Sequence, residues 1–233
     1  FKEAAVLTVD GVGEWTTTTM GKATSFFEGE TGVNNIELFS EQRFPHSLGL
    51  LYSTFTAWLG FRVNNGEYKV MGMSPYGQAR YTDKIEKVVN IDYSSGAYSL
   101  NMDYFDYHHS IERSYSQKFI DLFGEARVPD AEFITLATNP ELKTETSTMK
   151  QNQYYADVAA SIQHVTEEAL IAILKELHAR TGLKNVVMAG GVALNTKANW
   201  RLLNETPFEE IFIQPAAGDD GGALGAALWA YHI

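Results

Sequence analysis

The sequence predicts an α/β fold, and the last third of the chain carries most of that prediction. Residues 151–180 place apolar side chains at spacings of three and four, which is typical of a long amphipathic helix. Short apolar runs at 185–189 and 210–214 are typical of buried strands, and 193–204 and 223–231 have helical character. Helices that alternate with short buried strands favour a layered fold with parallel neighbouring strands.

The first third of the chain predicts a meander of antiparallel strands. Residues 6–9 form a candidate buried strand, and the sequence DGVGE at 10–14 is typical of a turn. The threonine-rich residues 15–20 would form the returning strand, because β-branched side chains are enriched in strands. Residues 22–27 and 34–39 would continue the meander.

The middle of the chain predicts short elements separated by loops. Residues 47–59 have the character of a largely buried helix, and 82–90 and 116–123 are further helix candidates. Residues 97–102 are typical of an edge strand. Residues 127–148 would form a loop-rich bridge to the last third.

Composition excludes several classes of protein. The chain has 233 residues, of which 45% are apolar and 20% charged, and this is enough for one or two domains with a proper core. The net charge is −11 without a basic cluster, so we expect no nucleic-acid partner. No apolar stretch approaches the ~20 residues that span a bilayer, so we expect no membrane partner. The absence of cysteine excludes disulfides and thiolate metal sites and fits a cytoplasmic protein.

Three glycine-rich turns follow predicted strands, at DGVG (10–13), at Gly190–Gly191 and at GDDGG (218–222). Ligands of open α/β sheets bind outside the carboxyl ends of strands, so these turns could line one cleft. Glycine allows a close approach to the backbone, and the N–H groups of a following helix suit an anion or a nucleotide. Tight strand-to-helix turns with nothing bound would show the same pattern.

The carboxylates of these turns also allow two interpretations. Near a phosphate, the carboxylates of the first and third turns would hold a divalent metal or a water molecule. Alternatively Asp219 or Asp220 caps the last helix, and for Asp220 we favour the cap. No His-x-x-x-His, serine-hydrolase elbow or P-loop motif is present, which disfavours those classes of enzyme.

The stretch GEYKVMGMSPYG (66–77) is dense in charge, glycine and proline. A charged turn that leads into a short helix and its stop explains this composition, and it is the interpretation that we favour. The alternative is that Glu67 or Lys69 reaches into the cleft.

Together these stretches resemble the carbamoyltransferase family of the nodulation protein NodU and the antibiotic O-carbamoyltransferases of tobramycin, cephamycin and novobiocin type. The matching stretches run in the family's order from residue 4 to residue 230, so the resemblance covers nearly the whole chain. The tRNA threonylcarbamoyl-transferring and hydrogenase-maturation enzymes are more distantly similar. The stretches are AAVLTVDGVGEWTTTTM, FPHSLGLLYSTFTAWLGF, GEYKVMGMSPYG, VVMAGGVALNTKANWRLL and IFIQPAAGDDGGALGAALWA.

The resemblance implies a ribonuclease H-like fold of the actin, heat-shock-chaperone and sugar-kinase type, with two related α/β subdomains around a nucleotide cleft. Residues 1–130 would be the remainder of the first subdomain with an inserted helical and loop segment, and 131–233 the second. The implied activity is ATP-dependent transfer of a carbamoyl group from carbamoyl phosphate, through carbamoyl-adenylate, to a hydroxyl acceptor. In the family, a YrdC-like domain of the same chain makes the carbamoyl-adenylate.

The resemblance also implies functional residues. Asp10 and Gly11 would lie on the phosphate side of the cleft, and Asp219 would ligate a divalent metal, with Fe²⁺ expected and Mg²⁺ as the other candidate. It identifies neither the general base nor the acceptor, although residues 103–150 are the expected place for acceptor-specific features. The positions that match the nucleotide motifs are Asp10, Gly11, Gly190, Gly191, Asn195 and Gly218.

The chain departs from the family in what it lacks. The family's His-x-x-x-His metal pair lies just upstream of the strand that begins here, and no other histidine spacing replaces it. The chain also begins with Phe1, close to a core strand. We therefore expect a fold truncated at its N-terminus, inactive when isolated, with feeble metal binding and with apolar surface left uncovered.

Two alternatives to carbamoyl transfer stay open at the level of sequence. A sugar or acetate kinase-type phosphotransferase would use the same nucleotide cleft with an aspartate base. A non-catalytic nucleotide-binding module would keep the glycine turns and lack the metal ligands. Dependence on carbamoyl phosphate separates the first alternative from carbamoyl transfer, and the sequence upstream of Phe1 tests the second.

Overall fold

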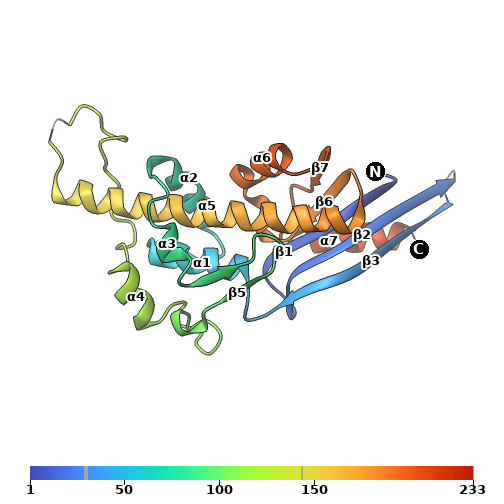
Figure 1. The fold of residues 1–233 in the computed structure, drawn as a ribbon, viewed down its shortest axis with the longest axis horizontal. Coiled ribbons are helices and arrows are strands. Elements are labelled where there is room, and N and C mark those ends of the chain that lie inside the picture. Colours follow the sequence, from blue (N-terminus) through green and yellow to red (C-terminus); the bar gives the residue numbers. More distant parts are fainter. Residues whose placement is uncertain (29–30, 143, 233) are drawn as a thin grey trace. The chain divides into compact units, whose positions relative to one another are not determined.

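The chain folds into two compact units (Figure 1), and the computed structural model describes residues 1–28, 31–142 and 144–232. The sheet unit comprises Phe1–Leu50, Asp92–Ala97 and Ala169–Ile233, and the helical unit comprises Leu51–Ile91 and Tyr98–Glu168. Both units take residues from each side of position 130. The assignment of 1–130 and 131–233 to two subdomains of a longer protein stays a prediction.

The sheet unit is built on a mixed sheet of five strands in the order β3-β2-β1-β6-β7. β1 pairs with β2 and β2 with β3 in antiparallel fashion, whereas β1 pairs with β6 and β6 with β7 in parallel fashion. The expected meander and the expected parallel strands therefore belong to one sheet. The strands are β1 (Glu3–Gly13), β2 (Thr16–Glu28), β3 (Thr31–Arg43), β6 (Asn185–Ala189) and β7 (Glu210–Ile213).

One face of this sheet is the core of the unit, and we call it the inner face. Ala5, Leu7 and Val9 alternate along β1 and are fully buried, as the period of two of a strand requires. The C-terminal half of helix α5 (Ser147–Thr181) runs across this face (Figure 1), where the Arg180 guanidinium lies 4.2 Å from the ring centre of Phe39.

Helix α5 confirms the apolar stripe that the sequence predicts. The stripe consists of side chains that are all at least 98% buried, at spacings of three and four residues. Gly182 ends the helix at φ +63, and its N–H donates to the His178 carbonyl at 2.7 Å, as a C-terminal glycine cap does. The stripe residues are Val158, Ile162, Val165, Ala169, Ile173 and Leu177.

The helix expected at 193–204 has a different start. Gly191–Leu194 forms a 3-10 turn, and α6 (Thr196–Glu205) begins after Asn195. The Asn195 side-chain oxygen accepts a hydrogen bond from Ala198 N at 3.0 Å, so asparagine caps the helix and moves its start. The last helix is α7 (Gly221–His232).

The helical unit is held together by edge-to-face aromatic packing. The Trp58 ring centre lies 6.0 Å from that of Phe123 and 5.3 Å from that of Tyr155, and Phe55 lies 5.1 Å from both Phe119 and Phe123. This unit also contains a two-stranded sheet. Its helices are most of α1 (Leu48–Trp58), α2 (Glu67–Met73), α3 (Thr82–Ile85), α4 (Gln117–Phe123) and the first part of α5, and its strands are β4 (Val89–Ile91) and β5 (Tyr98–Leu100).

The prediction of a helix over 82–90 is wrong in its second half. α3 ends at Ile85, and Val89–Ile91 pairs with Tyr98–Leu100 as an antiparallel hairpin. The β-branched residues of 88–91 favour a strand over a helix, and tertiary pairing with β5 decides the outcome. Within the described residues, no helix is long and apolar enough to cross a membrane.

Candidate functional site

The three glycine-rich stretches meet at the carboxyl ends of β1, β6 and β7. The prediction of a turn at 10–14 is wrong for 10–13, because Gly13 still pairs with Thr16 and these residues form the end of β1, so that the chain turns only at 14–15. We keep the name first turn for 10–13. Gly190 N donates to the Ala217 carbonyl at 2.8 Å, which joins the second turn to the third. Gly191 N donates to Asp10 Oδ1 at 3.2 Å, which joins the second turn to the first. Because these strands are parallel, their carboxyl ends share one edge of the sheet, the edge at which α/β sheets bind ligands.

Asp10 is the side chain that braces the first two turns. Its Oδ1 accepts hydrogen bonds from Gly11 N at 2.7 Å and from Gly191 N at 3.2 Å. Its Oδ2 has no hydrogen-bond partner among the described residues, and the residue is half-buried. Asp10 therefore holds two backbone segments together and keeps one anionic oxygen available.

The brace requires glycine on the β6 side. Gly190 has φ +94, a backbone conformation that side chains with a Cβ rarely adopt. A Cβ on Gly190 would also collide with the Val9 carbonyl of β1. The close approach of β6 to β1 at this level thus depends on Gly190.

The start of α1 packs against the first turn, a contact that sequence analysis missed. Ser47 Oγ donates to the carbonyls of Asp10 and Gly11, at 2.9 and 2.7 Å, and accepts from Leu50 N at 3.0 Å. A Cβ on Gly49 would lie 2.6 Å from the Asp10 carbonyl oxygen. Ser47 precedes the first residue of α1, and serine is a preferred N-cap residue. This preference is the signal in the sequence that could have pointed to the contact.

The third turn presents its backbone amides. The N–H groups of 218–220 make no hydrogen bond within the described part of the chain, and they lie at the N-terminus of the 12-residue helix α7. Unpaired amides at a helix N-terminus attract anions. The expected cap is not formed, because the Asp220 carboxylate makes no hydrogen bond to the described backbone, and both Asp219 and Asp220 are exposed.

Side chains from α6 fix the turn after β6. The Asn195 oxygen caps α6, as described above, so part of its hydrogen-bonding capacity is already used. Asn199 Nδ2 donates to the Ala193 carbonyl at 2.7 Å and holds the 3-10 turn closed.

The structure therefore brings only some of the predicted nucleotide-binding residues into direct contact. Asp10, Gly11 and Gly191 meet directly through Asp10 Oδ1. Gly190 is bonded to Ala217, the neighbour of Gly218 in the chain. Asn195 lies at the far end of the 3-10 turn from Gly191.

A metal site does not follow from these residues. Among the described residues, no group of three or more His, Asp or Glu side chains could hold a metal ion. Asp219 is an exposed carboxylate without such companions, and hard divalent cations need several oxygen ligands. The donor set of the described chain does not fit Fe²⁺ or Mg²⁺ by itself.

The GEYKVMGMSPYG stretch has a structural explanation within the helical unit. Glu67 Oε1 accepts from Ser53 Oγ at 2.8 Å and from Asn64 N at 3.0 Å. The Lys69 ammonium lies 5.8 Å from the ring centre of Phe61. These contacts are local to the helical unit and agree with the charged-turn interpretation.

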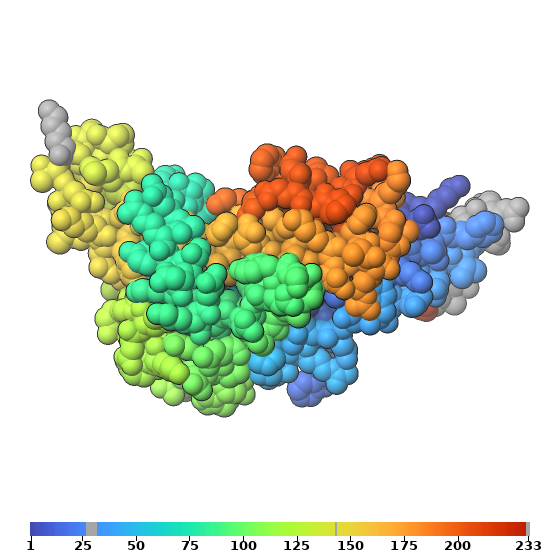
Figure 2. Space-filling model, viewed as in Figure 1, coloured from blue at the N-terminus to red at the C-terminus, as the bar shows by residue number. Residues whose placement is uncertain are grey.

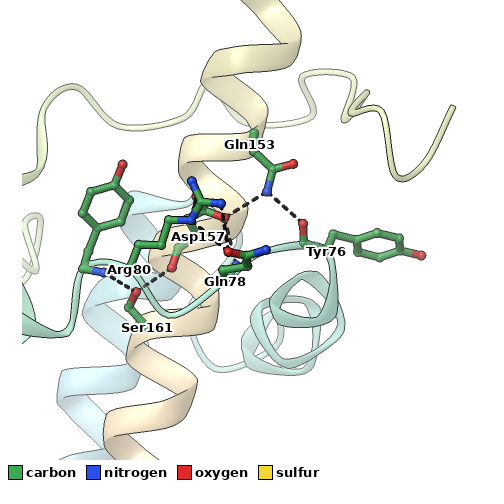
Figure 3. A network of polar contacts seen from close by, with 7 residues as sticks. Tyr76, Gln78, Arg80, Gln153, Asp157 and Ser161 are labelled. Atoms are coloured by element: carbon green, nitrogen blue, oxygen red, sulfur yellow. Dashed lines mark hydrogen bonds and ion pairs between the residues drawn. The ribbon is translucent and has the colours of Figure 1, made fainter. Parts of the chain in front are cut away.

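The loop 74–81 that ends this stretch is bound to α5 by polar contacts around Asp157 (Figure 3). Asp157 Oδ1 accepts from Gln78 N and from Gln153 Nε2, both at 2.9 Å, and Oδ2 lies 3.8 Å from Arg80 Nε. Ser161 Oγ accepts from Tyr81 N at 3.0 Å. The loop is thus attached to one face of the long helix.

Taken together, the mixed sheet and the three joined turns define an α/β protein with a candidate ligand site at its strand ends. Residues 1–228 match the family model described as carbamoyltransferase N-terminus, and the chain belongs to that family.

Curated relatives agree with this assignment. An uncharacterised protein of Synechocystis sp. is 46% identical over 233 residues, which are 100% of this chain and 34% of the relative. The nodulation protein NolNO of Sinorhizobium fredii is 31% identical over 229 residues, 98% of this chain and 28% of the relative. The tRNA N6-adenosine threonylcarbamoyltransferase of Desulfitobacterium hafniense is 29% identical over 214 residues, 86% of this chain and 61% of the relative. The chain thus spans about a third of the length of the first two relatives.

Proposed function

We propose that the chain is the acceptor-side part of an ATP-dependent O-carbamoyltransferase. Such an enzyme would take the carbamoyl group from carbamoyl phosphate and pass it, through carbamoyl-adenylate, to a hydroxyl acceptor. Family membership supports carbamoyl transfer in general. The observation that carries the nucleotide part of the proposal is the junction of the three strand-end turns. The unpaired amides of 218–220 directly follow Ala217, which takes part in that junction.

The fold supports the same proposal. Three antiparallel strands followed by two parallel strands, with α5 and α6 as crossovers, agree with a ribonuclease H-like subdomain of the actin and sugar-kinase type. The threonylcarbamoyltransferase relatives point in the same direction. In that fold, a second subdomain would complete the nucleotide cleft.

The chemistry at the junction would be acyl transfer from a mixed anhydride. The acceptor oxygen would form a bond to the carbamoyl carbon, and the bond from that carbon to the bridging oxygen would break. AMP would leave with the electron pair of that bond, and the acceptor proton would pass to a base that the structure does not identify.

Backbone amides supply the stabilisation that this reaction needs. The amides of 218–220 would bind the phosphate of the adenylate at the N-terminus of α7. An amide donor aimed at the developing oxyanion contributes about 3 kcal/mol to such reactions. Asp10 would act on the reaction indirectly, by holding Gly191 in place.

ATP is the proposed cofactor, and Gly11, Gly190, Gly191, Asn195 and Gly218 are the proposed nucleotide contacts. A YrdC-like domain of a longer chain is the proposed source of the adenylate. Asp219 would become a metal ligand only if other polypeptide supplied further donors.

The nucleotide site is tested by calorimetric titration with a non-hydrolysable ATP analogue. We expect a dissociation constant between micromolar and millimolar, and weaker binding by the Asn195→Ala variant. Asn195→Ser separates the two roles of this residue, because serine keeps the helix cap but loses the amide. Asn204→Ala is the matched control, since the Asn204 side chain bonds the Trp200 carbonyl near the other end of α6. Unchanged binding by Asn195→Ser would reduce Asn195 to a cap.

The reaction is tested on the complete protein with labelled carbamoyl phosphate, ATP and a panel of hydroxyl compounds. We expect label in an acceptor only when ATP and carbamoyl phosphate are both present. Phosphorylation of an acceptor without carbamoyl phosphate would contradict carbamoyl transfer and favour the kinase alternative. Nucleotide binding without either reaction would favour the non-catalytic module.

A further inference from the structure

The second face of the sheet, which we call the outer face, is apolar and exposed. Paired positions place Ala23 opposite Ile36, Gly21 opposite Leu38, and Val187 opposite Phe212. Val6 of β1 pairs with both Gly21 and Val187, so Ile36, Leu38 and Phe212 share this face. Ile36 is 64% exposed, Leu38 56% and Phe212 54%. Residues at the same level on the inner face of β1 and β6 are buried, as Leu7 and Val186 show.

Helix α7 covers the outer face only in part. A groove of about 1130 Å³ lies between the helix and the strands, and it is lined by Ile36, Phe212, Leu228 and Trp229 among others. α7 itself carries large apolar side chains that stay exposed, with Trp229 72% and Leu228 50% exposed. A helix that is apolar on all sides is normally buried on all sides.

The inner face shows how a fully covered face of this sheet is built. Figure 2 views the molecule from the side on which α5 and α6 lie over the sheet unit, coloured orange to red. α5 is long and amphipathic, and its apolar stripe is buried. The outer face carries exposed apolar side chains and one short helix, and contiguous exposed apolar surface of this kind marks an interaction site.

We propose that the outer face and α7 are covered by polypeptide of the same protein that lies outside residues 1–233. The first relatives are about three times as long as this chain, so their family has the additional polypeptide that such a contact needs. Phe1 and Lys2 line the groove, so residues joined to Phe1 would leave from the groove itself. Such a tether raises the local concentration of the occupant, which favours it over a separate partner.

The contact has a consequence for the strand-end junction. α7 begins at Gly221, directly after the free amides of 218–220, and a Cβ on Gly221 would collide with the Ala216 carbonyl. Polypeptide that packs on α7 would therefore hold in place the helix whose N-terminus carries these amides. The proposal about the outer face holds whether or not the carbamoyl reaction is confirmed.

The test uses cysteine accessibility in the complete protein, with any cysteine outside residues 1–233 replaced by serine, since residues 1–233 contain none. Ile36→Cys and Trp229→Cys report on the outer face. Phe26→Cys is the matched control, because Phe26 is 70% exposed, points to the other face of the sheet and does not line the groove. We expect the thiols at 36 and 229 to react at least tenfold more slowly than the thiol at 26.

Several outcomes would overturn the proposal. Equal reaction rates at the three positions would show that the outer face is open. Protection that disappears on dilution, together with a dimeric mass at high concentration, would assign the face to a second copy. A complete gene that encodes no residues beyond this chain would remove the proposed occupant. A photo-crosslinker placed at 229 that joins residues outside 1–233 in a monomer would support it.

Discussion

The strand-end junction and the loop 74–81 are built in the same way and differ in what they leave unpaired. In each region a glycine lies so close to a neighbouring carbonyl that a Cβ would collide with it, Gly190 against Val9 and Gly77 against Ala156. In each region an aspartate accepts a backbone N–H from a distant segment, Asp10 from Gly191 and Asp157 from Gln78.

The difference lies in the second oxygen of each carboxylate. The Asp157 side chain is 5% exposed, its Oδ1 accepts two hydrogen bonds, and its Oδ2 faces Arg80. Asp10 is half-buried, and its Oδ2 is without a hydrogen-bond partner in the described part of the chain. Buried polar groups are normally satisfied, so the loop is a finished structural contact. The junction keeps an unpaired anionic oxygen, and a turn joined to it keeps unpaired amides, as a binding site does.

Gly77→Ala is expected to have the largest effect on stability. The new Cβ would meet the backbone carbonyl of α5, which cannot move aside as a flexible side chain does. We expect a loss of about 3 kcal/mol or more in the free energy of unfolding, measured with urea. Gly72→Ala is the control, because nothing lies within 4 Å of its Cβ position inside α2. The control should be neutral or stabilising by up to about 1 kcal/mol, and an equal loss in both variants would contradict the structure of the loop.

Gly190→Ala should be similarly destabilising and should in addition abolish nucleotide binding. The substitution combines a collision with Val9 and an unfavourable positive φ, so the cost is about 2–4 kcal/mol. Urea unfolding and titration with the ATP analogue measure the two effects. Gly225→Ala, with open space around its Cβ position, is the control for glycine removal in the same unit. If Gly77→Ala also abolished binding while the protein stayed folded, the two regions would not differ as described.

Asp157→Ala should cost about 1–3 kcal/mol, because it leaves the part-buried contacts to the Gln78 amide and to Gln153 unmade. Asp157→Asn should recover part of this loss, since an amide oxygen still accepts. Nucleotide affinity should not change in either variant. Asp121→Ala, an exposed residue on α4, is the control and should change the free energy of unfolding by at most about 0.5 kcal/mol.

Asp10→Asn should have the smallest effect on stability and a distinct effect on binding. Asparagine keeps an oxygen for Gly11 and Gly191 but removes the negative charge beside the proposed phosphate position. Like charges a few ångströms apart in water repel by about 0.7 kcal/mol, so binding measured in EDTA should become about threefold tighter. Asp10→Ala should weaken binding, because it releases the brace. Unchanged affinity in both variants would place the phosphate away from Asp10.

The sequence predicts the elements whose periodicity is strong. The strand at 185–189 has the predicted bounds, and the stripe on α5 is buried as expected, because long-range packing there agrees with local pattern. Strand lengths were underestimated. The pattern predicts separate strands at 15–20 and 22–27, yet Thr16–Glu28 forms the single strand β2, since a glycine at 21 is tolerated where β3 approaches closely.

The sequence predicts the glycine-rich turns of the candidate site but not the hydrogen bonds that join them. Three turns after apolar runs could be found by pattern alone, and their meeting follows from parallel pairing. That Asp10 would brace Gly191 could not be found, because 181 residues separate them and no periodicity links them. The Ser47 contact and the Asp157 network likewise depend on tertiary geometry, which a local pattern does not encode.

The hydrogen bond from Gly191 N to Asp10 also determines when the site can form during synthesis. During synthesis, residue 10 leaves the ribosome long before residues 191 and 217 exist. At about 5–20 residues per second, roughly 10 to 40 seconds separate the first turn from the third. The meander β1–β3 can pair early, but β1 has to wait for its parallel partner β6. A nascent chain released before residue 217 would therefore carry most of residues 1–233 and lack the joined turns, so ligand binding would report that synthesis has passed residue 217.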